Sequence, residues 1–269
     1  MEEHVVFDFF EDIFSMVESN FVREYQKFRD MISPSYLLDP PYRNILTAVA
    51  RGDGKLYSVL RKAKVSEGVG EEIVSELISL NILYLEHSRE QPLKIHPKHK
   101  LKKEFRSYRI QGKLRFVQPF MRFWFAFVIP YEKSLLYSDS EAFMDNFKKN
   151  YERLRTLVYE QLCDALLIQY FENTQPLLSH GSYWDKYSEF DILAITGGKK
   201  LVLGECKYKE RKVCKNELTK LKAKALQSGI KVDTYALFSK SGFSNELLGM
   251  KDETLLLFNL DDLKILLGS

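Results

Sequence analysis

Three charged residues, Asp191, Glu205 and Lys207, stand in two otherwise apolar segments that are predicted to be strands. Asp191 lies near the start of the segment 190–196, where an acid is rare without a reason. Glu205 and Lys207 end the segment 201–207, and the two-residue period of a strand puts them on one face. An acid and a base on one face can share a site. These three residues are therefore the candidate catalytic set.

The register of the hairpin that these strands would form decides whether the two acids meet. Residues directly opposite in an antiparallel pair lie on the same face of the sheet. If Asp191 faces Glu205, apolar residues also face one another: Leu193 with Leu203, and Ile195 with Leu201. The loop is then Gly197-Gly198-Lys199, and such three-residue loops favour glycine at the left-handed position. A two-residue Gly197-Gly198 turn would shift the register by one and separate the acids unless a bulge intervened.

Two carboxylates that converge on one point repel each other unless a cation joins them, and hard oxygen ligands select Mg²⁺ or Mn²⁺. Such a metal polarises a scissile phosphate and lowers the pKa of a bound water. Lys207 beside it would orient that water or stabilise charge on the phosphate. The alternative is that the three side chains only pair with one another at a sheet edge. The two acids and the lysine are spaced across one hairpin that lies between two predicted helices. This pattern favours a metal site over simple pairing of the three side chains.

The elements around this hairpin form a mixed α/β pattern from about Tyr151 onward. A helix is predicted over 151–171, strands over 175–179, 190–196 and 201–207, a helix over 215–227, a strand over 232–238, a short helix from 244, and a strand over 254–258. The order is αβββα followed by β, α and β. It predicts a mixed sheet covered by helices.

Asp191 with Glu205-Cys206-Lys207 in this order resembles the PD-(D/E)XK nuclease superfamily, although Phe190 stands where many members have proline. The resemblance implies that the two acids bind metal and that the lysine serves the nucleophilic water. It also implies a metal set of Asp191, Glu205 and Cys206. Glu160 matches the glutamate of the first helix that supports the metal in many members.

Three modules are expected before the domain at 151–269: a helical segment at 1–33, a winged helix at 34–115 and an aromatic helical connector at 116–150. The winged helix is predicted from helices at 42–50, 55–63 and 67–80, followed by strands at 82–86 and 93–96. Its third helix is acidic, and carboxylates repel phosphate. A spacer or protein-contacting role is therefore favoured over sequence reading. In the connector, Phe120, Phe123, Trp124 and Phe127 have helical spacing and are expected to be core.

The chain from about Tyr42 onward is also similar to a family of unknown function that forms the C-terminal domain of archaeal-type ATPases. The segments that carry this similarity are Tyr42-Arg43-Asn44-Ile45-Leu46, Phe120-Met121-Arg122-Phe123-Trp124-Phe125, Gly204-Glu205-Cys206-Lys207 and Phe238-Ser239-Lys240-Ser241-Gly242-Phe243. The sequence has no GxxxxGK[ST] motif, so nucleotide hydrolysis is not expected of it. A separate ATPase subunit is the partner that the resemblance implies.

The net charge is only +3, but its distribution along the chain is uneven. Ten lysines and arginines lie between 199 and 224 against three glutamates, around the candidate site. Nucleic acid, with DNA favoured, is therefore expected against this surface rather than on the winged helix. The residues expected to contact it are Lys209, Arg211, Lys212, Lys215 and Lys222. Charge reversal there should weaken DNA binding more than reversal at Lys62 and Lys64.

Cysteine usage and hydropathy indicate the compartment. The three cysteines form no CxxC pair, and the N-terminus lacks a basic signal region. No apolar run is long enough to cross a membrane. Reduced thiols and a cytoplasmic location are expected. The sequence is compatible with a homodimer but does not decide the oligomeric state.

These observations favour a DNA endonuclease that depends on Mg²⁺ or Mn²⁺ and acts with an ATPase encoded elsewhere. The first alternative is an inactive protein of nuclease fold that serves as a DNA-binding or adaptor module. The second alternative is a winged-helix transcription regulator, which the acidic third helix disfavours. An intact set of Asp191, Glu205 and Lys207 favours the first hypothesis over the inactive alternative.

Overall fold

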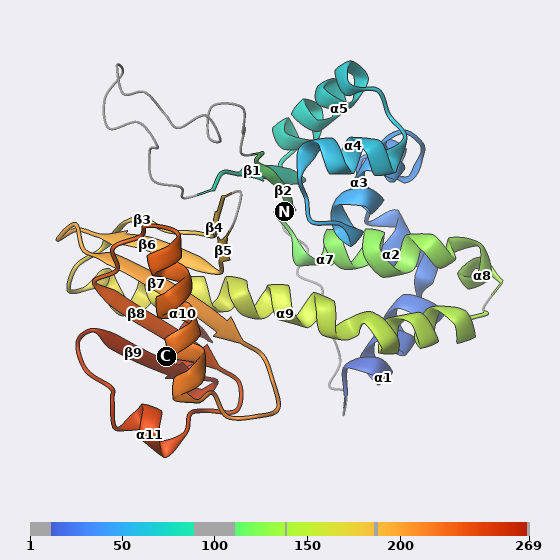
Figure 1. Ribbon diagram of the computed structural model, residues 1–269. Coiled ribbons are helices and arrows are strands. Elements are labelled where there is room, and N and C mark those ends of the chain that lie inside the picture. The colour runs from blue at the N-terminus through green and yellow to red at the C-terminus, as the bar shows by residue number, and fades with distance from the viewer. Residues whose placement is uncertain (1–11, 89–110, 138, 186–187, 268–269) are drawn as a thin grey trace. The chain divides into compact units, whose positions relative to one another are not determined.

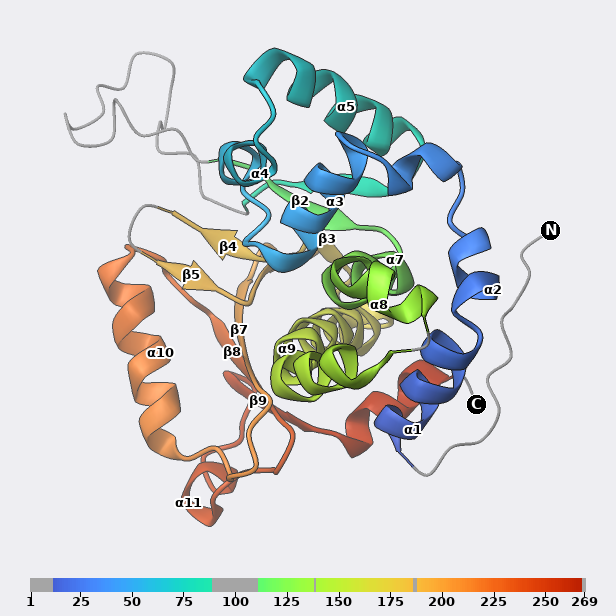
Figure 2. The same ribbon diagram turned by 90° about the vertical axis from the view of Figure 1, so that its right-hand side faces the viewer.

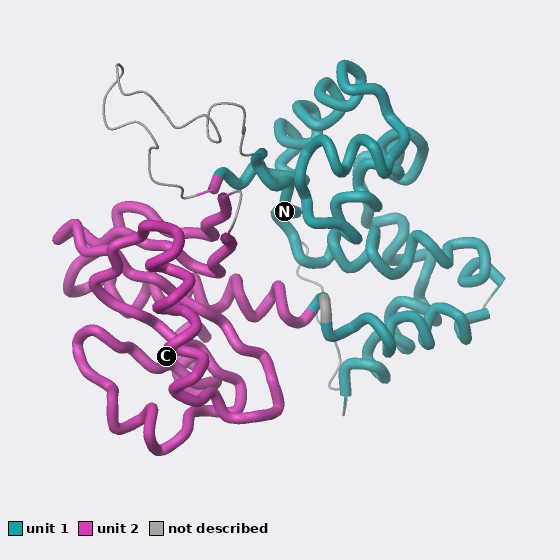
Figure 3. Tube along the Cα trace, viewed as in Figure 1, with its two compact units in different colours: residues 1–87, 111–154 teal, residues 88–110, 155–269 magenta. Residues whose placement is uncertain are grey.

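The computed structural model describes residues 12–88, 111–137, 139–185 and 188–267, which Figures 1 and 2 draw as ribbons. The chain folds into two compact units, shown in Figure 3. We call the first, Met1–His87 with Gln111–Leu154, the helical unit. The second, Ser88–Ile110 with Arg155–Ser269, is the sheet unit. One long helix, α9 (Glu141–Glu172), contributes to both.

The helical unit opens with short helical segments that bury one apolar face. These segments are α1 (Ile13–Val17), the π-helical η1 (Glu18–Arg23), α2 (Tyr25–Asp30), η2 (Ser35–Leu38), α3 (Tyr42–Arg51), α4 (Leu56–Ala63) and α5 (Glu67–Ser79). The Asp12 carboxylate caps α1 by accepting from the backbone N of Phe14 and Ser15 at 2.7 and 2.9 Å. Helices α3, α4 and α5 agree with the sequence prediction to within one residue at each end.

A two-stranded antiparallel sheet follows α5. Strand β1 (Leu83–Glu86) pairs with β2 (Lys113–Phe116), with Leu83 opposite Phe116. The strand predicted at 82–86 is therefore present, and its partner is β2. The other predicted strand, at 93–96, lies outside the described residues.

The aromatic segment forms part of the core of the helical unit, as its helical spacing predicts. It comprises α7 (Pro119–Phe123), the π-helical η3 (Trp124–Val128), η4 (Ile129–Tyr131) and α8 (Glu132–Leu136). Trp124 and Phe125 are fully buried, and side chains from all three ranges expected before residue 151 share this core. Helix α9 begins at Glu141 rather than near Tyr151, because Phe143 and Phe147 extend its buried face towards the N-terminus.

The sheet unit contains a five-stranded mixed sheet in the order β3-β6-β7-β8-β9. Its strands are β3 (Leu177–Ser179), β6 (Ile192–Thr196), β7 (Leu201–Lys207), β8 (Thr234–Ser239) and β9 (Leu255–Asn259). The pairs β3–β6 and β6–β7 are antiparallel, whereas β7–β8 and β8–β9 are parallel. A short pair, β4 (Tyr183–Trp184) with β5 (Glu189–Phe190), and the closing 3-10 helix η5 (Asp261–Leu267) were not predicted.

Helices cover both faces of this sheet, as Figure 2 shows. Tyr159 and Cys163 of α9 pack with Val202 and Cys206 on one face. Helix α10 (Lys215–Gln227) has the predicted bounds and packs Leu218, Leu221 and Ala225 against Leu193 and Leu203 on the other face. Helix α11 (Asn245–Leu248) adds Leu247 to that second core. Strand alternation then places Glu205 and Lys207 on the face that α10 covers.

Candidate active site at the ends of β6 and β7

The β6–β7 hairpin has the register in which Asp191 faces Glu205. Leu193 pairs with Leu203, and Ile195 pairs with Leu201. The ladder ends at Ile192 opposite Gly204, so Asp191 lies one residue beyond it, level with Glu205. The apolar pairing that the sequence predicted is therefore confirmed.

The turn of this hairpin differs from the expectation in one respect. The left-handed residue is Lys199, with φ 60°, and not a glycine. The Lys199 N–H donates to the Thr196 carbonyl at 2.8 Å, which closes the turn. A Cβ on Gly197 would lie at an ordinary contact distance of 3.4 Å from the Pro176 carbonyl oxygen, and one on Gly198 would lie 3.0 Å from the Oε1 atom of the Gln175 side chain. The turn therefore places its lysine, and neither glycine, in the left-handed conformation that favours glycine.

Asp191 lies between β5 and β6, where its carboxylate meets the backbone of β7. Its Oδ2 accepts a hydrogen bond from the Cys206 N–H at 2.7 Å. Burial is the largest influence on the Asp191 carboxyl and the charge of Glu205 is the next, and together they raise its pKa to about 6. The Cys206 N–H and the charges of Lys207 and Lys224 act in the opposite direction. The Asp191 carboxylate is therefore less stable as an anion than an exposed one.

Glu205 and Lys207 are both largely buried and form an ion pair. Each side chain is 19% exposed. Burial acts to lower the pKa of Lys207, but the contact with Glu205 and the charges of Glu205 and Asp191 outweigh burial and raise it. Lys207 therefore stays protonated beside the two acids.

Helix α10 adds two charged residues that the sequence did not place in the site. The Lys224 ammonium contacts the Glu189 carbonyl oxygen and lies 4.6 Å from the centre of the Phe190 ring. Its charge acts to lower the pKa of Asp191, against the larger effects of burial and Glu205. Glu217, seven residues earlier and so on the same flank of the helix, raises the pKa of Lys207. The sequence shows that Glu217 and Lys224 lie seven residues apart beside the buried face of a predicted helix. Only the packing of α10 on this face of the sheet assigns the two residues to the site.

Gly204 is required by the close approach of β6. A Cβ at this position would lie 2.9 Å from the Ile192 Cβ, closer than side chains normally pack. Ile192 is the terminal residue of the β6–β7 ladder and directly follows Asp191. A side chain at Gly204 would therefore push β6 away from β7 next to the site.

Cys206 contributes its backbone to the site, because its side chain lies on the other face. The thiol is buried beside Cys163 of α9, and burial raises its pKa. The Lys207 carbonyl accepts from the Lys240 N–H beyond β8, whereas the Cys206 N–H points to Asp191 beside β6. In a strand the N–H and C=O of one residue face the same neighbour, so the Cys206 carbonyl faces the Asp191 side.

Glu160 comes from α9, which covers the face opposite Glu205 and Lys207. It is half-buried, and its charge contributes to raising the pKa of the Cys206 thiol. The structure thus brings Asp191, Glu205 and Lys207 together and places Glu160 beside the Cys206 side chain.

The oxygen atoms at this point suit a hard divalent cation such as Mg²⁺ or Mn²⁺ better than a softer metal such as copper. In the part of the chain that the structure describes, no group of three or more His, Cys, Asp and Glu side chains is arranged to hold a metal. The donors here are the carboxylates of Asp191 and Glu205 with the Cys206 carbonyl. Mg²⁺ is commonly held by one or two carboxylates while it keeps several waters. The donor set fits that mode.

The five residues expected to contact nucleic acid are dispersed over the sheet unit. Lys209, Arg211 and Lys212 are exposed in the segment after β7. Arg211 lies 3.7 Å from the Glu217 carboxylate, and Lys215 pairs with Glu246 at 2.8 Å. Lys222 lies 5.3 Å from the centre of the Tyr235 ring, on the flank of α10 away from Lys224.

The comparisons with known proteins concern family and fold alone. Residues 124–223, somewhat more than a third of the chain, match the family described as archaeal and bacterial proteins of unknown function. No curated protein matches the chain. No helix among residues 12–88, 111–137, 139–185 and 188–267 is long and apolar enough to cross a membrane.

Two solved structures resemble parts of the chain. One is a protein of unknown function, AF1548, with 18% identity over 38% of this chain and 57% of that one, and a TM-score of 0.28. The other is protein VC1899 from Vibrio cholerae, with 15% identity over 96% of this chain and 56% of that one, and a TM-score of 0.30. The chain thus spans little more than half the length of either structure.

Proposed function

We propose that the protein is a metal-dependent nuclease of the PD-(D/E)XK type, with its active site at Asp191, Glu205 and Lys207. The observation that carries the proposal is the convergence of two buried acids and one buried lysine on one face, at the ends of two paired strands. Burial and the charge of Glu205 raise the pKa of Asp191, and the contact with Glu205 raises the pKa of Lys207 despite burial, as expected of a site built to hold a cation.

The order of elements supports the same assignment. The second half of α9 precedes β3, β6 and β7, and α10 and β8 follow them. This is the αβββαβ order of the superfamily, with the acids at the hairpin of the second and third strands. In the helical unit, we interpret α3, α4, α5 and the β1–β2 pair as a winged helix. Glu76 of α5 accepts hydrogen bonds from the hydroxyls of Tyr36 and Tyr42, so its carboxylate serves packing within the unit.

The site residues have separate tasks in phosphodiester hydrolysis. Asp191, Glu205 and the Cys206 carbonyl would hold Mg²⁺ or Mn²⁺, which when bound supplies charge stabilisation and a more acidic water. Lys207 would orient the attacking water and stabilise negative charge on the phosphate. The attacking water would lose a proton to solvent as its oxygen forms the new bond to phosphorus, the bond to the leaving sugar oxygen would break, and that oxygen would receive a proton from solvent. Lys224 and Glu217 would position Asp191 and Lys207 through their charges.

A cleavage assay on the full chain tests the proposal. The protein is incubated with supercoiled plasmid and with linear DNA, in Mg²⁺, in Mn²⁺ or in EDTA. We expect nicking that requires a divalent cation and falls at least about 100-fold in Asp191→Asn and Lys207→Ala. Two exposed residues of the same unit provide matched controls, Glu253→Gln and Lys251→Ala. Equal cleavage by control and site variants would trace the activity to a contaminant and reject the assignment.

One observation favours a second candidate, an inactive protein of nuclease fold that binds DNA or serves as an adaptor. Lys207 is paired with Glu205, one of the two carboxylates that a metal needs. In this second candidate, Lys207 would stay paired with Glu205 at all times. Mg²⁺ would then neither bind nor promote cleavage. Absence of cleavage in the assay, together with retained DNA binding, would select this candidate. Action together with a separate ATPase subunit is a further part of the proposal and applies to both candidates.

A further inference from the structure

A groove with a volume of about 800 Å³ lies within the helical unit, and none of its lining residues is assigned to the nuclease site. One wall is the face of α3 that carries Arg43, Thr47 and Arg51. The others are the end of α4, at Lys62 and Lys64, and the segment 129–134. Every lining residue belongs to the same compact unit.

The lining of the groove is strongly basic. Five cations line it, and they are Arg43, Arg51, Lys62, Lys64 and Lys133. Glu132 is the one carboxylate among the lining residues. Neutral polar groups come from Asn44, Thr47 and Ser134.

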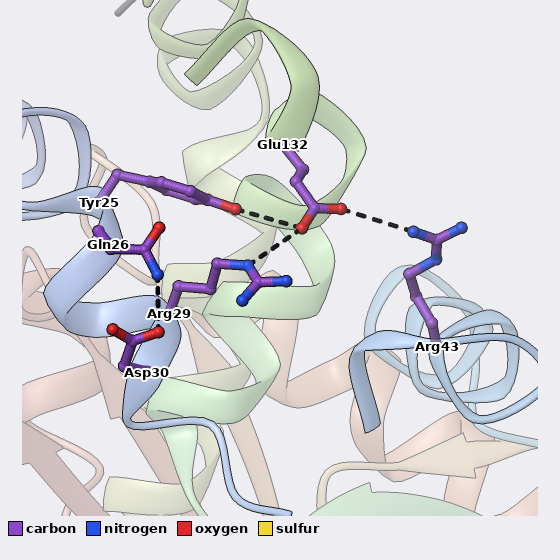
Figure 4. A network of polar contacts seen from close by, with 6 residues as sticks. All are labelled: Tyr25, Gln26, Arg29, Asp30, Arg43 and Glu132. Atoms are coloured by element: carbon purple, nitrogen blue, oxygen red, sulfur yellow. Dashed lines mark hydrogen bonds and ion pairs between the residues drawn. The ribbon is translucent and has the colours of Figure 1, made fainter. Parts of the chain in front are cut away.

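Glu132 is already engaged and neutralises only one of these five cations. Figure 4 shows its carboxylate between the Tyr25 hydroxyl, Arg29 and Arg43, at 3.3, 3.4 and 3.5 Å. The same view shows Gln26 donating to Asp30 at 2.7 Å, a separate contact outside the groove. The Glu132 carboxylate is therefore shared with Arg29 and is not free to pair with the remaining cations.

The other four cations face the groove without counter-ions. Arg51, Lys62, Lys64 and Lys133 are exposed, and none forms an ion pair with any residue whose position the structure describes. The Lys62 ammonium lies over the end of α3, 3.4 Å from where a Cβ on Gly52 would be. By contrast, Lys207, Arg211, Lys215 and Lys240 in the sheet unit all have carboxylate partners.

The groove is too long for a single phosphate ion. Arg43 and Arg51 are eight residues apart on α3, which corresponds to about 12 Å along the helix axis. Cations distributed over such a length match the regular spacing of phosphates in a nucleic-acid strand. The neutral donors can add hydrogen bonds to phosphate oxygens without reading bases.

We propose that this groove binds the phosphate backbone of a nucleic acid without sequence preference. The inference is independent of the proposed nuclease activity, since the groove needs neither the metal nor Asp191. It reverses the ranking expected from the sequence, in which Lys62 and Lys64 mattered less than the basic segment after β7. The reason is clustering: the groove brings four cations without carboxylate partners among the described residues into one cavity, whereas Arg211 and Lys215 after β7 each lie beside a glutamate.

Binding of the full chain to a fluorescein-labelled DNA duplex of mixed sequence, measured by anisotropy in EDTA at several salt concentrations, tests the inference. The groove variant carries Arg51→Ala, Lys62→Ala, Lys64→Ala and Lys133→Ala. The matched control removes four exposed cations of the same unit outside the groove, with Arg23→Ala, Lys27→Ala, Lys148→Ala and Lys149→Ala. EDTA prevents metal-dependent cleavage, so a failed nuclease assay would not affect this result.

We expect the groove variant to lose affinity on the order of 100-fold and its salt slope to fall by about 3 to 4, since each phosphate contact contributes about 0.9 to the slope. The control should stay within about threefold of the unchanged protein. Single reversals, Lys64→Glu and Lys133→Glu, should each weaken binding if the fourfold variant does not fold by circular dichroism. Equal losses in groove and control variants would overturn the proposal. So would unaltered DNA binding by the groove variant, or tighter binding of the unchanged protein to phosphatidylserine vesicles than to DNA.

Discussion

The backbone N–H of Cys206 donates a hydrogen bond to Oδ2 of Asp191 over 2.7 Å, at the point where β6 and β7 cease to pair. This contact fixes the Asp191 carboxylate level with Glu205. One hydrogen bond to the charged form does not offset burial and a neighbouring negative charge, so the pKa of Asp191 rises to about 6. The position of Asp191 beside Glu205, which suits a bound cation, therefore destabilises the folded protein when no cation is bound.

The pH dependence of stability should reveal this cost. Between about pH 4 and pH 6 the folded protein binds more protons at Asp191 than the unfolded chain does, so the free energy of unfolding falls as the pH rises through that window. Asp191→Asn keeps an acceptor for the Cys206 N–H and does not titrate. We expect it to raise the free energy of unfolding at pH 8 by up to about 3 kcal/mol, and by little at pH 4. Urea unfolding at both pH values measures the difference.

Glu253→Gln is the control for this measurement, because Glu253 is exposed. It should change the free energy of unfolding by less than about 0.5 kcal/mol at either pH. A gain in Asp191→Asn that is the same at pH 4 and pH 8 would show that the ionisation of Asp191 is not its cause.

Glu160 should influence metal binding from the opposite face of β7. If Mg²⁺ binds at Asp191 and Glu205, it should raise the melting temperature of the folded protein in a concentration-dependent manner. Because groups around metal ligands tune affinity, we expect Glu160→Gln to need about tenfold more Mg²⁺ for the same increase. Differential scanning fluorimetry over a Mg²⁺ titration at pH 8 provides the measurement.

Glu172→Gln offers a matched control, since Glu172 is an exposed residue at the end of the same helix. Identical titrations for the Glu160 and Glu172 variants would remove Glu160 from the site. Failure of Mg²⁺ to stabilise even the unchanged protein would argue against the metal itself and favour the inactive alternative.

The three cysteines should differ sharply in reactivity. All three are free thiols, with Cys163 and Cys206 buried and Cys214 exposed. Burial raises the pKa of the Cys206 thiol, which further reduces its thiolate fraction. Ellman's reagent should therefore label one thiol rapidly in the folded protein, and all three in denaturant. Cys214→Ser should abolish the rapid phase, and a second rapid equivalent would mean that the core between α9 and the sheet opens readily.

Local patterns in the sequence determined much of the sheet unit. The register of β6 and β7 followed from two apolar pairs, Leu193 with Leu203 and Ile195 with Leu201, because residues on one face of a short hairpin are close in sequence. The bounds of α10 followed from a single amphipathic face with residues Leu218, Leu221 and Ala225. The proximity of Asp191 to Glu205 is a consequence of the same local register.

Only the tertiary structure decided which charges act together. Lys224 reaches Asp191 because α10 packs on that face of the sheet, and no local pattern relates residues so far apart in sequence. Lys199, and neither glycine of the same turn, takes the left-handed position, which the residue types alone did not indicate. The sequence shows where lysines and arginines are but not which carboxylates face them. Folding pairs some of those near the sheet, such as Lys207 and Lys215, and gathers Arg51, Lys62, Lys64 and Lys133 around one groove, because ion pairing depends on distances in space that the order of residues does not contain.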